Sequence, residues 1–134
     1  MRQSPSPRFA TRRGLIIGLA ALTAGAWSLL TAAQMPRAIF VTLTDGKASG
    51  PDLTLPARGA PVLRLVQGEA VELRVASDRA TVLHLHGYRI ETRAEPNAPA
   101  VMAFTARAAG RFAVETHAAN DRHVALFYIE VHPR

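Results

Sequence analysis

Apolar and polar side chains alternate in the stretch AVELRVAS, residues 70–77, where Val71, Leu73 and Val75 are apolar members. Successive side chains of a β-strand point to opposite faces, so this period of two predicts a strand with one dry face and one wet face. An amphipathic helix needs a period near 3.6 instead. Residues 70–77 therefore have to belong to a sheet that covers a core on one side.

Turn residues divide the rest of the domain into similar short segments. Gly, Pro, Asp and Ser cluster in the stretches QGE, SDRA and RAAG and in two longer loops, 44–61 and 92–100. The predicted strands cover residues 38–43, 53–55, 62–66, 70–77, 81–91, 101–106, 111–117 and 124–133. Short strands at this spacing, without a long helical pattern, predict an all-β antiparallel or Greek-key sandwich of about seven strands.

An apolar stretch precedes this domain. Residues 14–33 carry no charge over a length that crosses a bilayer, and four arginines come before them. The stretch predicts one hydrophobic helix, so that residues 1–33 are either a cleaved signal peptide or an uncleaved transmembrane signal anchor. In both cases residues 34–134 form a domain on the periplasmic or other extracytoplasmic side of the cytoplasmic membrane.

Charge and cysteine content exclude several classes of function. The chain has a formal net charge of +6, but four of its 16 basic residues precede position 34, whereas all 10 acidic residues follow it. The domain is thus close to neutral and has no basic run suited to nucleic acid. The absence of cysteine removes disulfides, thiolate nucleophiles and thiolate metal ligands. Any metal ion would be bound by nitrogen, oxygen or a methionine thioether.

Four of the chain's five histidines are candidate metal ligands. His84 and His86, in the segment LHLHGY, share one face of a strand. Such a pair can bind one copper or zinc ion, or it can be two polar residues on the wet side of a sheet. His117 and His123 flank the polar loop before the last predicted strand, and their positions favour the metal site.

Other polar and sulfur-containing residues have competing interpretations. Glu115 shares a strand face with His117. Three interpretations of its carboxylate stay open: an oxygen ligand, an acceptor for an imidazole N–H, or a solvated group. Met102, in the segment VMAF, is predicted to be a core residue rather than a thioether ligand. No segment has the context of a hydrolytic active site.

Two longer stretches resemble the cupredoxin family. LRLVQGEAVELRVASDRATVLHLHGY is similar to the middle of a cupredoxin, where an alternating strand and a polar turn precede the strand with the first histidine ligand. FTARAAGRFAVETHAANDRHVALFYIEVHP is similar to the end of such a domain, with a ligand loop before the final strand. The resemblance covers residues 60–133 and implies a cupredoxin-like β-sandwich.

One feature of that family is missing. A blue-copper site needs a cysteine near the end of the penultimate strand, and Thr116 stands about there. His84 matches the family's first histidine ligand, whereas His117 and His123 are substitutes near the lost cysteine and the far end of the ligand loop. The string HLHG also resembles the His-x-His-Gly motif of multicopper oxidases, which supports His86. The resemblance thus implies a type-2-like copper site made of histidines.

These features predict an exported, membrane-tethered domain that binds copper and acts in copper handling or in electron transfer to a membrane-associated protein. The alternative is a metal-free sandwich that serves as an accessory or binding module of a membrane complex. A small copper enzyme is a third possibility. A copper site requires the His84 and His86 imidazoles to lie within about 10 Å of His117 or His123 before metal binds.

Overall fold

The computed structural model describes residues 35–117 and 122–134, and these residues are all-β. Ten strands follow one another: β1 (Arg37–Thr44), β2 (Lys47–Ser49), β3 (Leu53–Thr54), β4 (Val62–Val66), β5 (Ala70–Ser77), β6 (Thr81–Leu85), β7 (Ile90–Ala94), β8 (Ala100–Thr105), β9 (Gly110–His117) and β10 (His123–His132). The prediction of an all-β domain is therefore confirmed.

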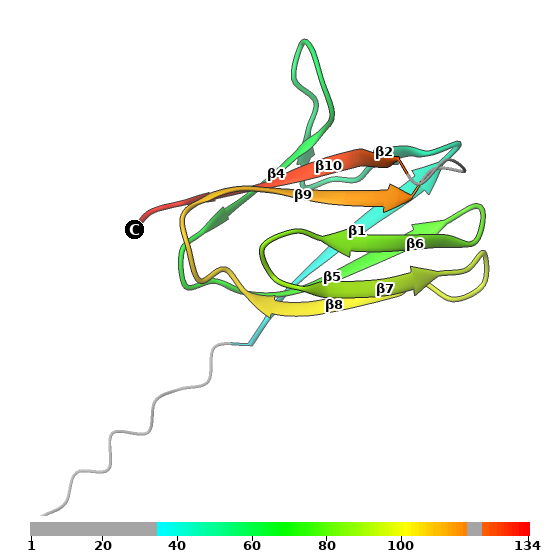
Figure 1. Ribbon diagram of the computed structural model, residues 1–134. Helices are drawn as coiled ribbons and strands as arrows, with labels where there is room; N and C mark the ends of the chain where they lie inside the picture. Colours follow the sequence, from blue (N-terminus) through cyan, green and yellow to red (C-terminus); the bar gives the residue numbers. More distant parts are fainter. Residues whose placement is uncertain (1–34, 118–121) are drawn as a thin grey trace, which may run out of the picture. The chain divides into compact units, whose positions relative to one another are not determined.

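The strands form two sheets that face each other as a sandwich (Figure 1). The smaller sheet has four strands in the order β2-β1-β5-β8, and the larger one has six in the order β3-β4-β10-β9-β6-β7. Strands β6, β9 and β10, which carry the four candidate histidines or end beside them, belong to the larger sheet.

Both sheets are mixed, so the prediction of an antiparallel sandwich is wrong in part. Strand β1 pairs with β5 in parallel, and β4 pairs with β10 in parallel. The remaining pairs are antiparallel. Alternating side chains identify a strand and its buried face, but they do not determine the direction of its neighbours.

The predicted strand 81–91 is two strands, β6 and β7, which form a hairpin around residues 86–89. Gly87 and Arg89 turn the chain with φ angles of 79° and 56°, in the left-handed region that glycine adopts without strain. A Cβ at Gly87 would also lie 2.7 Å from the ring of Phe112. The predicted loop 92–100 is shorter than expected, because β7 continues to Ala94.

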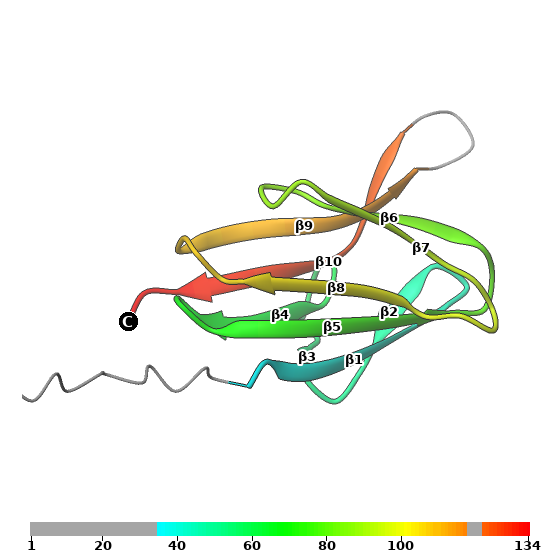
Figure 2. The same cartoon turned by 90° about the horizontal axis from the view of Figure 1, so that it is seen from below.

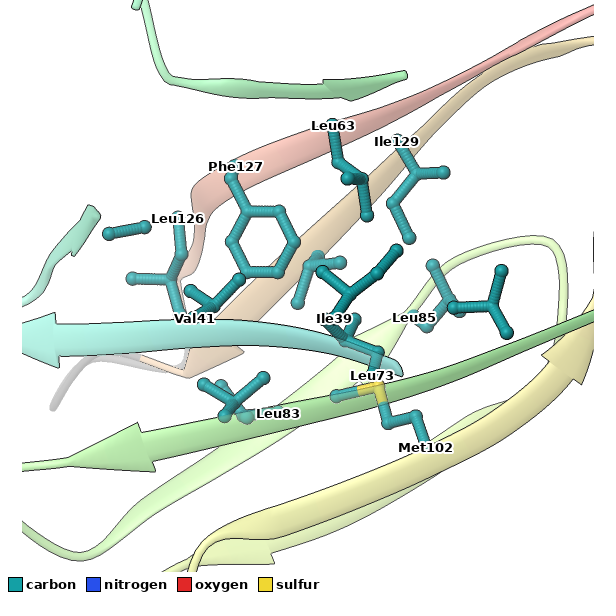
Figure 3. Packing of buried hydrophobic residues seen from close by; sticks show 14 of the residues in the cluster. Ile39, Val41, Leu63, Leu73, Leu83, Leu85, Met102, Leu126, Phe127 and Ile129 are labelled. Carbon is teal, nitrogen blue, oxygen red and sulfur yellow. The ribbon is translucent and has the colours of Figure 1, made fainter. Parts of the chain in front are cut away.

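Side chains from the inner faces of both sheets form one core (Figure 3). Ile39 and Leu73 come from the four-stranded sheet, and Leu85 and Phe127 come from the six-stranded sheet; each is fully buried. Met102 is 1% exposed in this cluster, which confirms its prediction as a core residue. The alternation predicted for β5 is observed: every second residue from Val71 is buried.

The apolar stretch 14–33 lies outside the described residues, and so does the choice between signal peptide and signal anchor. Among residues 35–117 and 122–134, no helix has the length and apolar character needed to span a bilayer.

Candidate metal centre

The candidate site lies on the outer face of the six-stranded sheet, over β6, β9 and β10. His84 on β6 is the register partner of Glu115 on β9, and His117 on β9 is the partner of His123 on β10. Partners in an antiparallel pair point to the same face, so all four side chains project from one side of the sheet. The leucines on either side of His84 are buried in the core behind it.

A β-bulge in β10 brings His123 to this face. Ala125 is paired with Glu115 and Phe127 is paired with Val114, so β10 uses one residue more than β9 at this point. The extra residue inverts the alternation, and Leu126 and Phe127 are both buried as a result. Without the bulge, His123 would lie on the same face as Phe127 and would point into the core.

Three histidines come together closely enough to share one ion. One nitrogen from each of His84, His86 and His123 lies within 4.8 Å of the other two. The ring centroids of His84 and His86 are 4.5 Å apart, and those of His86 and His123 are 5.9 Å apart. The requirement that these histidines approach within about 10 Å before metal binds is confirmed.

Glu115 contacts two of these three rings. Its Oε2 lies 3.0 Å from Nδ1 of His123 and 2.8 Å from Nε2 of His86, and its side chain is only 18% exposed. A carboxylate accepts hydrogen bonds and does not donate them, so Nδ1 of His123 carries the proton in this contact. The lone pair on Nε2 of His123 is then available to a metal ion.

Nε2 of His86 has a different environment. The atom is buried and has no hydrogen-bond partner among the described residues, although Oε2 of Glu115 is only 2.8 Å away. The two atoms are close enough for an ion pair but form no hydrogen bond, since hydrogen bonds weaken steeply when bent. A buried imidazole nitrogen without a partner is costly unless a ligand uses it. The histidines present therefore fit a bound metal ion.

The remaining histidines differ in their relation to this cluster. The ring of His117 lies 4.4 Å from that of His123, but His117 is exposed and is not one of the three whose nitrogens converge. His132 is exposed at the far end of β10. The four candidates thus form a group of three with His117 at its edge.

Sequence reasoning selected these residues but missed the bulge. The segment VALFYIEV contains a signal for the bulge. Apolar residues occupy every second position up to Leu126 and every second position again from Phe127, so the alternation shifts by one residue between these two neighbours. Of the three roles predicted for Glu115, that of an acceptor for an imidazole N–H agrees with its contact with Nδ1 of His123.

Comparisons with known proteins found similar structures but no similar sequences. No family model matches the chain, and no curated protein matches it in sequence. In structure, it is similar to a chain of a heme-copper terminal oxidase dimer solved by cryo-electron microscopy, with a TM-score of 0.50 and 18% identity over 70% of this chain and 60% of that one. A multicopper oxidase follows with a TM-score of 0.42 and 12% identity over 71% of this chain and 43% of that one.

At such identities the likeness to the oxidase chain shows the fold alone. It supports a β-sandwich fold for this domain. The chain spans less than two thirds of the length of either neighbour, so their activities do not transfer with the fold.

Proposed function

We propose that this protein is an exported, membrane-tethered cupredoxin-like domain that binds copper(II) through His84, His86 and His123, with His117 available as a further ligand. The observation that carries the proposal is the convergence of three imidazole nitrogens within 4.8 Å of one another. Imidazoles that already converge need little rearrangement to bind an ion.

The donor set favours copper over other ions. The chain has no cysteine, and Met102 is buried in the core, so nitrogen and oxygen are the donors at this face. Imidazole suits copper and zinc, and the Irving–Williams order places copper(II) above the other divalent ions of the first row. A carboxylate beside the histidines adds negative charge that a divalent cation offsets. When bound, the ion would form a type-2-like centre.

The proposed role is the handling of copper at the outer side of a membrane. A site without thiolate lacks the ligand on which blue-copper electron-transfer sites are built. The rings are also accessible: the side chains of His86 and His123 are 44% and 46% exposed. Such a site can accept an ion from, or release it to, a partner protein. The uncharged stretch 14–33 supports the membrane tether, and a membrane-associated partner follows from that location.

A copper titration of the purified full chain tests this function. We expect one tightly bound copper(II) and an electron paramagnetic resonance signal of the type-2 kind with nitrogen hyperfine structure. The signal should be lost in the double variant His84→Ala/His86→Ala and retained in His132→Ala, which removes a histidine at the far end of β10.

The absence of tight binding by the unmodified chain would refute the metal site. In that case the alternative, a metal-free accessory module of a membrane complex, becomes the better description, and the search moves to protein partners. Equal loss of signal in His132→Ala would likewise refute the assignment of the ligands.

A further inference from the structure

One end of the sandwich carries a group of exposed arginines, which we call the arginine end. It consists of the turns 67–69, 86–89 and 106–109 and the two C-terminal residues, and it contains Arg89, Arg107 and Arg134. Figure 2 shows the start of β1, the turn between β4 and β5, the turn between β8 and β9 and the C-terminus at this one end. All three arginines are exposed.

Backbone and side-chain contacts hold the arginine end together. The amide of Gly68 donates to the carbonyl of Ala106 at 2.8 Å, and the guanidinium of Arg134 lies over Gly68. The guanidinium carbon of Arg107 lies 5.7 Å from the centre of the Tyr88 ring, in the neighbouring turn. The arginines therefore belong to one surface rather than to separate loops.

The charge of this surface is not balanced. Within residues 35–117 and 122–134, Arg89, Arg107 and Arg134 form no ion pair. The nearby carboxylate of Glu69 is already paired with Arg37. At the opposite end, Arg79 is paired with Asp45 and Asp78, and Arg93 is paired with Glu95. Among the described residues of that end, Lys47, Arg58 and Arg122 form no ion pair, so they are the matched set for a control.

The chain also enters the domain at the arginine end. Strand β1 begins beside the start of β5, since Arg37 is the register partner of Val71. Met35, just before β1, is 91% exposed, and Val66 beside the turn 67–69 is 47% exposed. In the sequence, the uncharged apolar stretch 14–33 ends two residues before Met35. A connection this short spans less than about 10 Å even when fully extended.

We propose that the arginine end docks on an anionic phospholipid surface. The proposal rests on the membrane tether proposed above, and it adds the orientation of the domain. Arginine guanidinium groups bind phosphate oxygens in bidentate geometry, and exposed aliphatic side chains such as Met35 enter the headgroup region beside them. The apolar stretch brings this end to the membrane, and the arginines fix which surface faces it.

This orientation places one side of the metal centre near the lipid, because His86 belongs to the turn 86–89 of the arginine end. Strand β9 starts at Gly110 at the arginine end, and Glu115 lies five residues further along it. At about 3.3 Å per residue, Glu115 and its register partner His84 stand roughly 17 Å from the start of β9. The other side of the metal centre, with His84 and Glu115, is therefore further from the lipid than His86 is.

Vesicle binding by residues 35–134 without metal tests the proposal. This fragment contains the whole core, from Ile39 to Val131, and so folds without the preceding segment. We expect it to co-sediment with vesicles of phosphatidylcholine and phosphatidylglycerol, to bind pure phosphatidylcholine vesicles weakly, and to dissociate as salt is raised. The triple variant Arg89→Gln/Arg107→Gln/Arg134→Gln should bind anionic vesicles about 100-fold more weakly, at about fivefold for each charge removed.

The matched control removes the same charge from the opposite end, as Lys47→Gln/Arg58→Gln/Arg122→Gln. It should bind anionic vesicles as the unmodified fragment does. Equal weakening by both triple variants, or no preference for anionic vesicles, would overturn the proposal and point to net charge or to a protein partner instead. Because no copper is present, these results stand apart from the outcome of the copper titration.

Discussion

The two faces of the six-stranded sheet differ in almost every property although they belong to the same strands. On the inner face, Leu83, Leu85 and Val114 are fully buried. On the outer face, one residue away along the same strands, His84 and Glu115 are register partners beside two further histidines. Burial of apolar area stabilises the fold on one side, and converging polar groups provide ligand chemistry on the other. Stability and metal binding should therefore be separable by substitution.

The largest expected effect is on the inner face. Phe127→Ala removes a fully buried ring from the centre of the core and should lower the free energy of unfolding by about 3–5 kcal/mol. Urea denaturation of the metal-free chain measures this loss. If the folded fraction of this variant binds copper as tightly as the unmodified chain, the two faces are separable as stated. A change in stability below about 1 kcal/mol would contradict the observed packing.

The next effect concerns the carboxylate on the outer face. Glu115→Gln keeps an acceptor for His123 but removes the negative charge, and copper(II) affinity should fall about 10- to 100-fold. A competition titration with a chelator measures the affinity. Glu91→Gln is the matched control, because Glu91 is the register partner of His84 on its other side and is exposed, and it forms no ion pair with a described histidine. Equal losses in both variants would mean that only overall charge matters.

A smaller effect separates His117 from the three converging histidines. His117→Ala removes a ring that packs on His123 but lies outside the group, so copper affinity should fall less than about tenfold. The same titration on His123→Ala, which removes a proposed ligand, should show a much larger loss. If the two variants lose affinity equally, His117 is a ligand and the site has four histidines.

The smallest effect lies at the end of the sandwich and belongs to neither face. The backbone N–H of Asp45, 2.8 Å from Oδ2 of Asp78, and then the guanidinium of Arg79 hold the pKa of Asp78 below its ordinary value of 3.8. The ionised carboxylate is thus favoured by folding, and its contribution to stability is present above pH 3.8 and is lost as the pH falls through the lowered pKa.

Comparison of the unmodified chain with Asp78→Asn measures this contribution. In urea denaturation, Asp78→Asn should be slightly less stable at pH 7, and the difference should vanish once the pH has fallen below the lowered pKa of Asp78. A difference that persists unchanged in acid would show that the carboxylate charge is not its cause.

Part of the fold was predictable because it depends on local chain geometry. Alternation along 70–77 predicted β5 with its buried face, and turn residues separated most of the other strands. The hairpin of β6 and β7 was missed, because a turn through Gly87 and Arg89 breaks a segment whose side chains still read as one strand. The short strand β2 was also missed, because Lys47–Ser49 lies in a stretch rich in turn residues.

The parallel pairs were not predictable from side-chain patterns. The burial pattern of β1 is the same whether its neighbour runs parallel or antiparallel, and only contacts between residues distant in sequence distinguish the two. The same holds for β4 beside β10.

By itself the sequence determined an all-β domain without thiolate chemistry and selected His84 and His86 as candidate ligands two residues apart. These properties follow from the amino-acid composition and from the alternation of side chains along an extended chain, and both depend only on the local sequence. Only the tertiary structure decided that His123 joins them and that Glu115 lies against two of the rings. The physical reason is the bulge at Leu126: it shifts the pairing of β10 with β9 by one residue, and a shift of one residue moves a side chain from the core to the opposite face.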